Sequence, residues 1–61
     1  MIKVKILLLD GTEKEFYAAD FAQQMSDGKV LYWMLDENES RAFSIPVKQI
    51  KWFSEDQDEE K

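Results

Sequence analysis

Residues 2–18, IKVKILLLDGTEKEFYA, decide the fold because they have the pattern of a β-hairpin. Alternate residues in the first part of this stretch are apolar, which is the period of an extended strand with one buried face. Asp10 and Gly11 follow, and an Asp-Gly pair readily adopts the positive backbone dihedral angles of a tight turn. We therefore predict a strand over residues 2–9 and an antiparallel partner over residues 13–18.

The rest of the chain reads as further short β elements. The run over residues 30–35, VLYWML, is strongly β-prone and apolar on both faces. Pro46 has no amide hydrogen to give to a ladder, so a strand before it should end there. The remaining predicted elements are strands over residues 41–45 and 50–53 and one helical turn over residues 46–49.

Residues 19–26 fit two different structures. Asp20 could cap a short helix over residues 20–26, with Gln23 three positions later and Gly28 just beyond its end. The same stretch could be a strand that leads into a second Asp-Gly turn. We favour the strand, because a helix of barely two turns has little intrinsic stability in water.

The alternation divides the apolar residues into two sets that together exceed what one small core needs. The set predicted to face inward is Ile2, Val4, Ile6, Leu8, Phe16, Val30, Tyr32, Met34, Phe43, Ile45, Ile50 and Trp52. The set predicted to form an exposed partner interface is Leu7, Leu9, Tyr17, Leu31, Trp33, Leu35 and Phe53. An apolar patch of that size marks a protein contact, unless Phe21 and the loops cover it within the same chain.

Composition argues against catalysis. The chain has 61 residues and contains neither histidine nor cysteine, so it lacks the usual general base, the strongest side-chain nucleophile and the preferred zinc ligands. The acidic loop over residues 36–39 lacks the glycine and the distal glutamate of a calcium-binding loop. We expect no enzyme activity, no catalytic or metal-binding residues and no cofactor.

The net charge of −5 is concentrated at the carboxyl end. Residues 55–61 hold five acids and one lysine, a net charge of −4, which leaves −1 for residues 1–54. A block of like charge without apolar residues buries nothing. We therefore predict a single β domain over residues 1–54, followed by a disordered acidic tail over residues 55–61.

Four lysines suggest an alternative function. If the first and last strands pair, Lys3, Lys5 and Lys51 share an outward surface, with Lys48 near its rim. Exposed aromatic rings beside these lysines could stack the bases of a single-stranded nucleic acid. Against this interpretation, the predicted domain has no basic excess.

The segment from Ala42 to Phe53, a strand, a proline-containing turn and a short strand, resembles the end of Sm-like, Tudor-like and other SH3-like small barrels. The resemblance implies that a helical turn joins the last two strands and that the last strand pairs with the first. We therefore predict an all-β fold, specifically a five-stranded antiparallel small barrel or strongly curved sheet of SH3-like type.

In composition the chain is also similar to short acidic orphan proteins of bacteria and their phages, some of which inhibit host nucleases or repair enzymes. We expect a cytoplasmic, non-catalytic interaction module that binds protein, as a homodimer or on a larger partner, and that could serve as a regulator or inhibitor. The alternative is a single-stranded nucleic-acid-binding barrel whose acidic tail competes with its ligand. Nothing in the first strand is long and apolar enough for a signal peptide or a membrane span.

Overall fold

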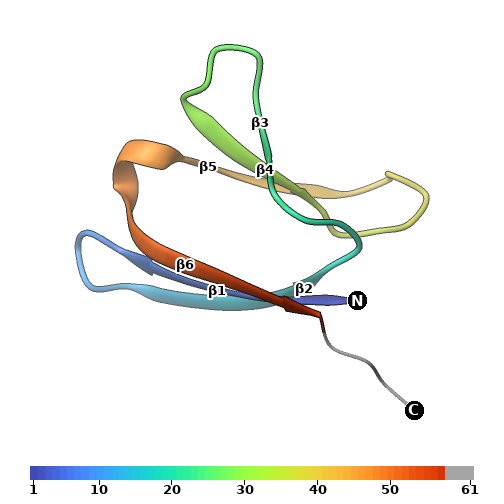
Figure 1. Ribbon diagram of the computed structural model, residues 1–61, viewed down its shortest axis with the longest axis horizontal. Helices are drawn as coiled ribbons and strands as arrows, with labels where there is room; N and C mark the ends of the chain where they lie inside the picture. The colour runs from blue at the N-terminus through green and yellow to red at the C-terminus, as the bar shows by residue number, and fades with distance from the viewer. Residues whose placement is uncertain (58–61) are drawn as a thin grey trace.

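The structure, a computed structural model, describes residues 1–57 and consists of two antiparallel sheets. Its elements are β1 (Ile2–Leu8), β2 (Glu13–Ala18), β3 (Gln23–Gln24), β4 (Val30–Met34), β5 (Ala42–Pro46), the 3₁₀ turn η1 (Val47–Gln49) and β6 (Ile50–Gln57). The first sheet has the strand order β2-β1-β6 and the second has the order β3-β4-β5. Figure 1 shows the two sheets as two layers, joined by η1 at one end. The prediction of a mainly-β domain is confirmed.

The hairpin of β1 and β2 is formed as predicted, with Ile2 opposite Ala18 and Leu7 opposite Glu13. Its turn is closed by a hydrogen bond of 2.9 Å from the Leu8 amide to the Thr12 carbonyl. Gly11 has a φ of 94°, a conformation that favours glycine over residues with a side chain. Of the Asp-Gly pair, only Gly11 has the positive φ that the sequence predicts, and the Asp10 side chain instead accepts a hydrogen bond of 2.8 Å from the Thr12 amide.

The last strand pairs with the first one. β6 lies antiparallel to β1, and Val4 is opposite Glu55. The helical turn predicted before it is present as η1, and the Leu9 amide donates to the Gln49 carbonyl at 3.0 Å where η1 meets the first sheet. The pairing register shifts between Leu7 and Leu8, which leaves Lys51 as an extra residue in β6.

The ambiguous stretch over residues 19–26 contains a strand and no helix. β3 is only two residues long, and Gln23 lies opposite Tyr32 of β4. The turn into β4 is fixed by hydrogen bonds from the Gly28 amide to the Met25 carbonyl (2.8 Å) and from the Met25 amide to the Val30 carbonyl (2.9 Å). The helix over residues 20–26 is therefore not formed.

The finer prediction of a five-stranded barrel or strongly curved sheet is not confirmed. Residues 1–57 form six strands in two separate sheets, and these sheets do not close into a barrel. The physical reason lies between β2 and β3, where residues 19–22 leave the ladder before the chain joins the second sheet.

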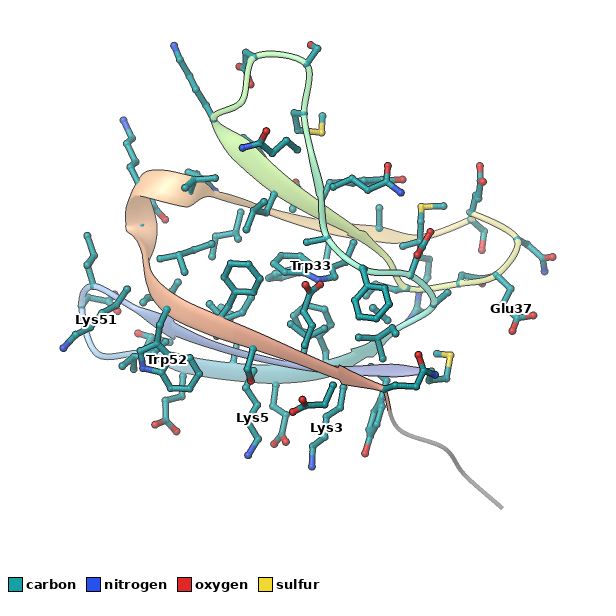
Figure 2. The ribbon with its side chains drawn as sticks, in the orientation of Figure 1. Lys3, Lys5, Trp33, Glu37, Lys51 and Trp52 are labelled. Atoms are coloured by element: carbon teal, nitrogen blue, oxygen red, sulfur yellow. The ribbon has the colours of Figure 1, made fainter. Side chains whose placement is uncertain are left out.

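The core lies between the two sheets and is centred on Trp33, whose side chain is fully buried (Figure 2). The rings of Phe16 and Phe53 meet the indole edge-on, with centroids 5.5 and 5.9 Å from it, and Phe43 lies at 6.0 Å. Edge-to-face contacts of this kind stabilise a core beyond the area that they bury. The buried residues are Ile2, Val4, Ile6, Ala18, Leu31, Trp33 and Ile45.

The predicted facing of β4 is wrong. Leu31 and Trp33 are buried, although we expected them in an exposed interface. The residues predicted to face inward, Val30, Tyr32 and Met34, are half-buried on the other side of the strand. Because every residue of β4 is apolar, its sequence alone carries no signal for which face meets the core.

The predicted boundary between domain and tail came too early. β6 continues through Glu55 to Gln57, so these residues belong to the first sheet. One carboxylate oxygen of Glu55 accepts hydrogen bonds of 2.6 Å from the Trp33 indole nitrogen and 2.6 Å from the Ala22 amide. This side chain thus ties the first sheet to the second. The rest of the predicted tail, residues 58–61, lies outside the described residues.

No helix in the described part of the chain has the length and apolar character needed to cross a bilayer.

Candidate functional site

The outer face of the first sheet gathers exposed aromatic and charged side chains. Ile2, Val4 and Ile6 of β1 are buried, so the alternate residues of that strand point away from the core. Residues directly opposite each other in neighbouring strands share a face. The register therefore places on one surface, here called the Trp52 face, the residues Lys3, Lys5, Leu7, Glu13, Glu15, Tyr17, Trp52, Ser54 and Asp56. Figure 2 shows Lys3, Lys5 and Trp52 projecting away from the second sheet.

Trp52 reaches this face because of the irregularity in β6. We predicted Ile50 and Trp52 on the same, inward side, as strict alternation requires. The extra residue, Lys51, reverses the facing after Ile50, so Trp52 lies opposite Leu7 and Phe53 lies opposite the buried Ile6. Trp52 is 47% exposed as a result, and the prediction that it faces inward is wrong.

The Trp52 face carries two lysines, Lys3 and Lys5, and three carboxylates, Glu13, Glu15 and Asp56. Lys3 and Lys5 of β1 lie beside Glu15 of β2, and Lys3 Nζ is 3.2 Å from Glu15 Oε2. Lys3 also lies opposite Asp56 in β6. The carboxylates of the face thus offset its lysines, and a surface of this kind has no basic excess.

A shallow hollow of 340 Å³ lies on the same face. The residues around it come from all three strands and are Lys5, Ile6, Leu7, Glu13, Lys14, Glu15 and Trp52. Sites for small molecules usually enclose most of their ligand's surface. A hollow on one face of a sheet is open on one side, so it is better suited to a side chain presented by a protein or peptide.

The residues of the predicted interface do not come together on one surface. Leu7 and Tyr17 lie on the Trp52 face, and Tyr17 is 47% exposed. Leu9 is 65% exposed but lies beyond β1, beside the hairpin turn. Leu31, Trp33 and Leu35 pack in or against the core, and Phe53 contacts Trp33 edge-on but remains 38% exposed. The surface centred on Leu31, Trp33 and Leu35 is therefore not available to a partner.

The predicted lysine surface is formed only in part. Lys3 and Lys5 share the Trp52 face, as expected from the pairing of the first and last strands. Lys51 is exposed at the irregular position of β6, and Lys48 is exposed in η1 (Figure 2 labels Lys51). These two lysines lie toward the η1 end of the molecule and not in the ladder positions that define the face.

The acidic loop after β4 is organised by its own hydrogen bonds. Asp36 accepts from the Asn38 amide at 2.7 Å and from the Ser40 hydroxyl at 2.6 Å. These two bonds, the Ser40 hydroxyl first, hold the pKa of the Asp36 carboxyl below its ordinary value. Among residues 1–57, no group of three or more acidic side chains is placed to hold a metal ion.

Comparison of the chain with protein-family models, with curated proteins and with solved structures gave no match. The sequence reasoning missed Trp52 as the most prominent exposed residue of the site. Its signal was the adjacent pair Trp52-Phe53, in which one ring must face outward whichever register the strand adopts.

Proposed function

We propose that this domain is a non-catalytic protein-binding module that contacts a larger partner through the Trp52 face. One observation carries the proposal: two large aromatic side chains, Trp52 and Tyr17, are each 47% exposed on a sheet face that has no basic excess. Tryptophan and tyrosine are the residue types that dominate the binding energy of protein interfaces. The lysines and carboxylates around these rings favour binding to a specific partner over non-specific association.

The area that Trp52 leaves uncovered is large enough to anchor a contact. A tryptophan side chain can bury up to roughly 250 Å², and about half of this one remains exposed. Covering that half stabilises a complex by about 3 kcal/mol at 25 cal/mol per Å². Leu7 lies opposite Trp52 in the ladder and supplies an apolar floor beside it.

A second candidate function is the binding of single-stranded nucleic acid by the same face. It is favoured by the position of Lys3 and Lys5 between the exposed rings of Tyr17 and Trp52, since bases stack on aromatic side chains and phosphates follow lysines. It is disfavoured by the ion pair that occupies Lys3 and by the carboxylates on both flanking strands. We therefore rank it second.

The test is site-specific photo-crosslinking in the cells that make the protein. A benzophenone amino acid replaces Trp52 in one variant. In the other variant it replaces Phe21, which is equally exposed at 47% but lies in the segment between β2 and β3. We expect a discrete protein adduct at position 52 and none at position 21. Tyr17→Ala in the same chain should weaken the adduct at position 52.

Identical adducts from both positions would refute the proposal, because they would reflect general surface contact. An adduct that is lost on nuclease treatment would instead select the nucleic-acid candidate. Its binding to a labelled oligonucleotide should then weaken steeply as salt is raised. Circular dichroism of both variants provides the control that the fold is intact.

We also infer an SH3-like arrangement, in which β2 and β3 are the two halves of one strand bent at residues 19–22. This interpretation is supported by the hydrogen bond of 2.6 Å from the Ala19 amide to the Met34 carbonyl, which starts the contact with the second sheet directly after β2. Counting β2 and β3 as one gives five strands. Cross-strand proton contacts between residues 19–22 and β4 in solution would support it, and a freely solvated connection would count against it.

A further inference from the structure

β5 is an edge strand, and the hydrogen bonds at its two ends determine which of its peptide groups point toward β4 and which point toward the open edge. The Leu35 amide donates to the Arg41 carbonyl at 3.2 Å just before β5, and the Val47 amide donates to the Lys29 carbonyl at 2.8 Å just after it. Hydrogen-bonded pairs recur at every second residue of an antiparallel ladder. The peptide groups that point toward β4 are therefore those of Phe43 and Ile45, and those that point toward the open edge are Ala42, Ser44 and Pro46.

Of the four sheet edges within residues 1–57, only this one is both long enough to pair and free of charge. β3 is two residues long, β2 carries Glu13, Lys14 and Glu15, and β6 carries several charged residues of its own. Lys14 even occupies an inward position opposite the buried Ile6, which is a recognised protection of edge strands. β5 reads Ala-Phe-Ser-Ile-Pro and has no such protection.

We propose that β5 pairs with β5 of a second copy of this chain, antiparallel and about a two-fold axis at Ser44. The Ser44 peptide groups of the two copies then bond to each other reciprocally. Each Ala42 amide donates to the Pro46 carbonyl of the second copy, and the return bond to the Ala42 carbonyl is not made because Pro46 has no amide hydrogen. The proline at the end of β5 therefore fits this register without leaving a buried amide unpaired. Ala42 and Ser44 are exposed and small, so a second strand can approach.

The charges at the two ends of β5 favour a second copy as the occupant. The loop before β5 carries Asp36, Glu37 and Glu39 against a single base, Arg41. The other end carries Lys48 in η1 and Lys29, whose carbonyl accepts from Val47, against one acid, Asp27, whose carboxylate accepts from the Lys29 amide. The acidic loop and η1 lie at opposite ends of β5 (Figure 1), and Glu37 is labelled at the loop end in Figure 2.

Antiparallel self-pairing brings the acidic end of one copy beside the basic end of the other, twice over. Parallel pairing would instead set acid against acid and base against base. The pattern is thus self-complementary in the one orientation that also satisfies the backbone. The result is one continuous sheet in which β3, β4 and β5 of both copies take part.

The experiment measures the mass of the full chain in solution across a range of concentrations. We expect a concentration-dependent species of twice the chain mass of 7.2 kDa. Ser44→Pro removes the two reciprocal donors at the axis and should weaken association by about tenfold or more. The matched control is Glu15→Pro, because its amide points toward the charged edge of β2, by the same alternation counted from the Leu8–Thr12 bond.

A charge reversal keeps the test sharp if a proline variant fails to fold. Lys48→Glu should weaken the dimer, and Glu37→Lys in the same chain should restore it, since each new lysine then faces the new glutamate of the second copy. A wild-type chain that stays monomeric at every concentration, equal effects of Ser44→Pro and Glu15→Pro, or no rescue by the double reversal would overturn the proposal. The Trp52 face takes no part in this contact, so either proposal can fail without the other.

Discussion

Replacing Glu55 by alanine should remove a large part of the free energy of unfolding. In the structure one carboxylate oxygen of Glu55 accepts from the Trp33 indole and from the Ala22 amide, at 2.6 Å each. Trp33 is fully buried, so its N–H group has no access to water when this acceptor is deleted. An unsatisfied buried donor costs about 1 to 3 kcal/mol.

The expected loss for Glu55→Ala is about 2 to 4 kcal/mol, with the indole contributing more than the half-buried Ala22. A domain of this size has a total stability of roughly 3 to 9 kcal/mol. With a urea dependence of about 1 kcal/mol per molar, the unfolding midpoint should fall by about 2 M or more. Glu55→Gln retains an amide oxygen as acceptor and should lose only about 1 kcal/mol.

Urea unfolding followed by tryptophan fluorescence measures these differences. The matched control is Asp56→Ala, the adjacent residue on the exposed side of the same strand, which should change the stability by about 0.5 kcal/mol or less. Equal midpoints for Glu55→Ala and Asp56→Ala would refute the reasoning. They would mean that β6 ends before Glu55 and that this carboxylate belongs to the tail, as its sequence neighbours suggest.

Three further outcomes are expected from single substitutions. Trp33→Ala should cost about 3 to 5 kcal/mol and leave little folded protein, whereas Trp52→Ala should cost about 1 kcal/mol or less, as measured by thermal unfolding. Gly11→Ala should lower the stability by about 1 to 3 kcal/mol in the same measurement, purely through the backbone, because φ is 94° and nothing lies within 4 Å of a new Cβ atom. Ser40→Ala should raise the pKa of Asp36 toward its ordinary value in a carboxyl NMR titration. Since the pKa of Asp36 is depressed in the folded state, its ionised form stabilises the fold above about pH 4, and this stabilisation is lost as the pH falls below that value.

The hairpin of β1 and β2 could be predicted because its signals are local. Alternation of apolar residues in β1 fixes which face is buried, and the Asp10-Gly11 pair fixes where the chain turns. The bounds of the two strands follow from these features to within one residue. The 3₁₀ turn after Pro46 was predictable for the same reason, since proline ends a ladder through its own chemistry.

The sequence could not predict which face of β4 is buried, because that depends on contacts with residues far away in the chain. All five residues of β4 are apolar, so either side could be buried. The choice is made by the ring cluster around Trp33 and by the carboxylate of Glu55, which lies 22 positions later. Sequence periodicity within one strand contains no information about such a contact.

The Trp52 face was predictable only in part. Lys3, Lys5, Leu7 and Tyr17 were placed outward correctly by alternation, yet they were assigned to two different surfaces, one apolar and one basic. Trp52 was assigned to the core, because the extra residue at Lys51 has no signature in the sequence. One insertion in the ladder thus separates the predicted site from the site in the structure.

The extra residue in β6 also bears on how the folding chain selects between two nearly equivalent alignments of its last strand. Without the irregularity at Lys51, Trp52 would take the place of Phe53 opposite Ile6, so an aromatic ring would enter the interior in either case. Burial of an aromatic ring therefore distinguishes poorly between the observed register of β6 and the register shifted by one residue. The distinction falls to the next inward position, where the shifted register offers the short hydroxyl of Ser54 in place of the carboxylate that holds the Trp33 indole. The polar contact of Glu55 thus selects between two registers of β6 that burial of apolar side chains alone would leave nearly equal in free energy.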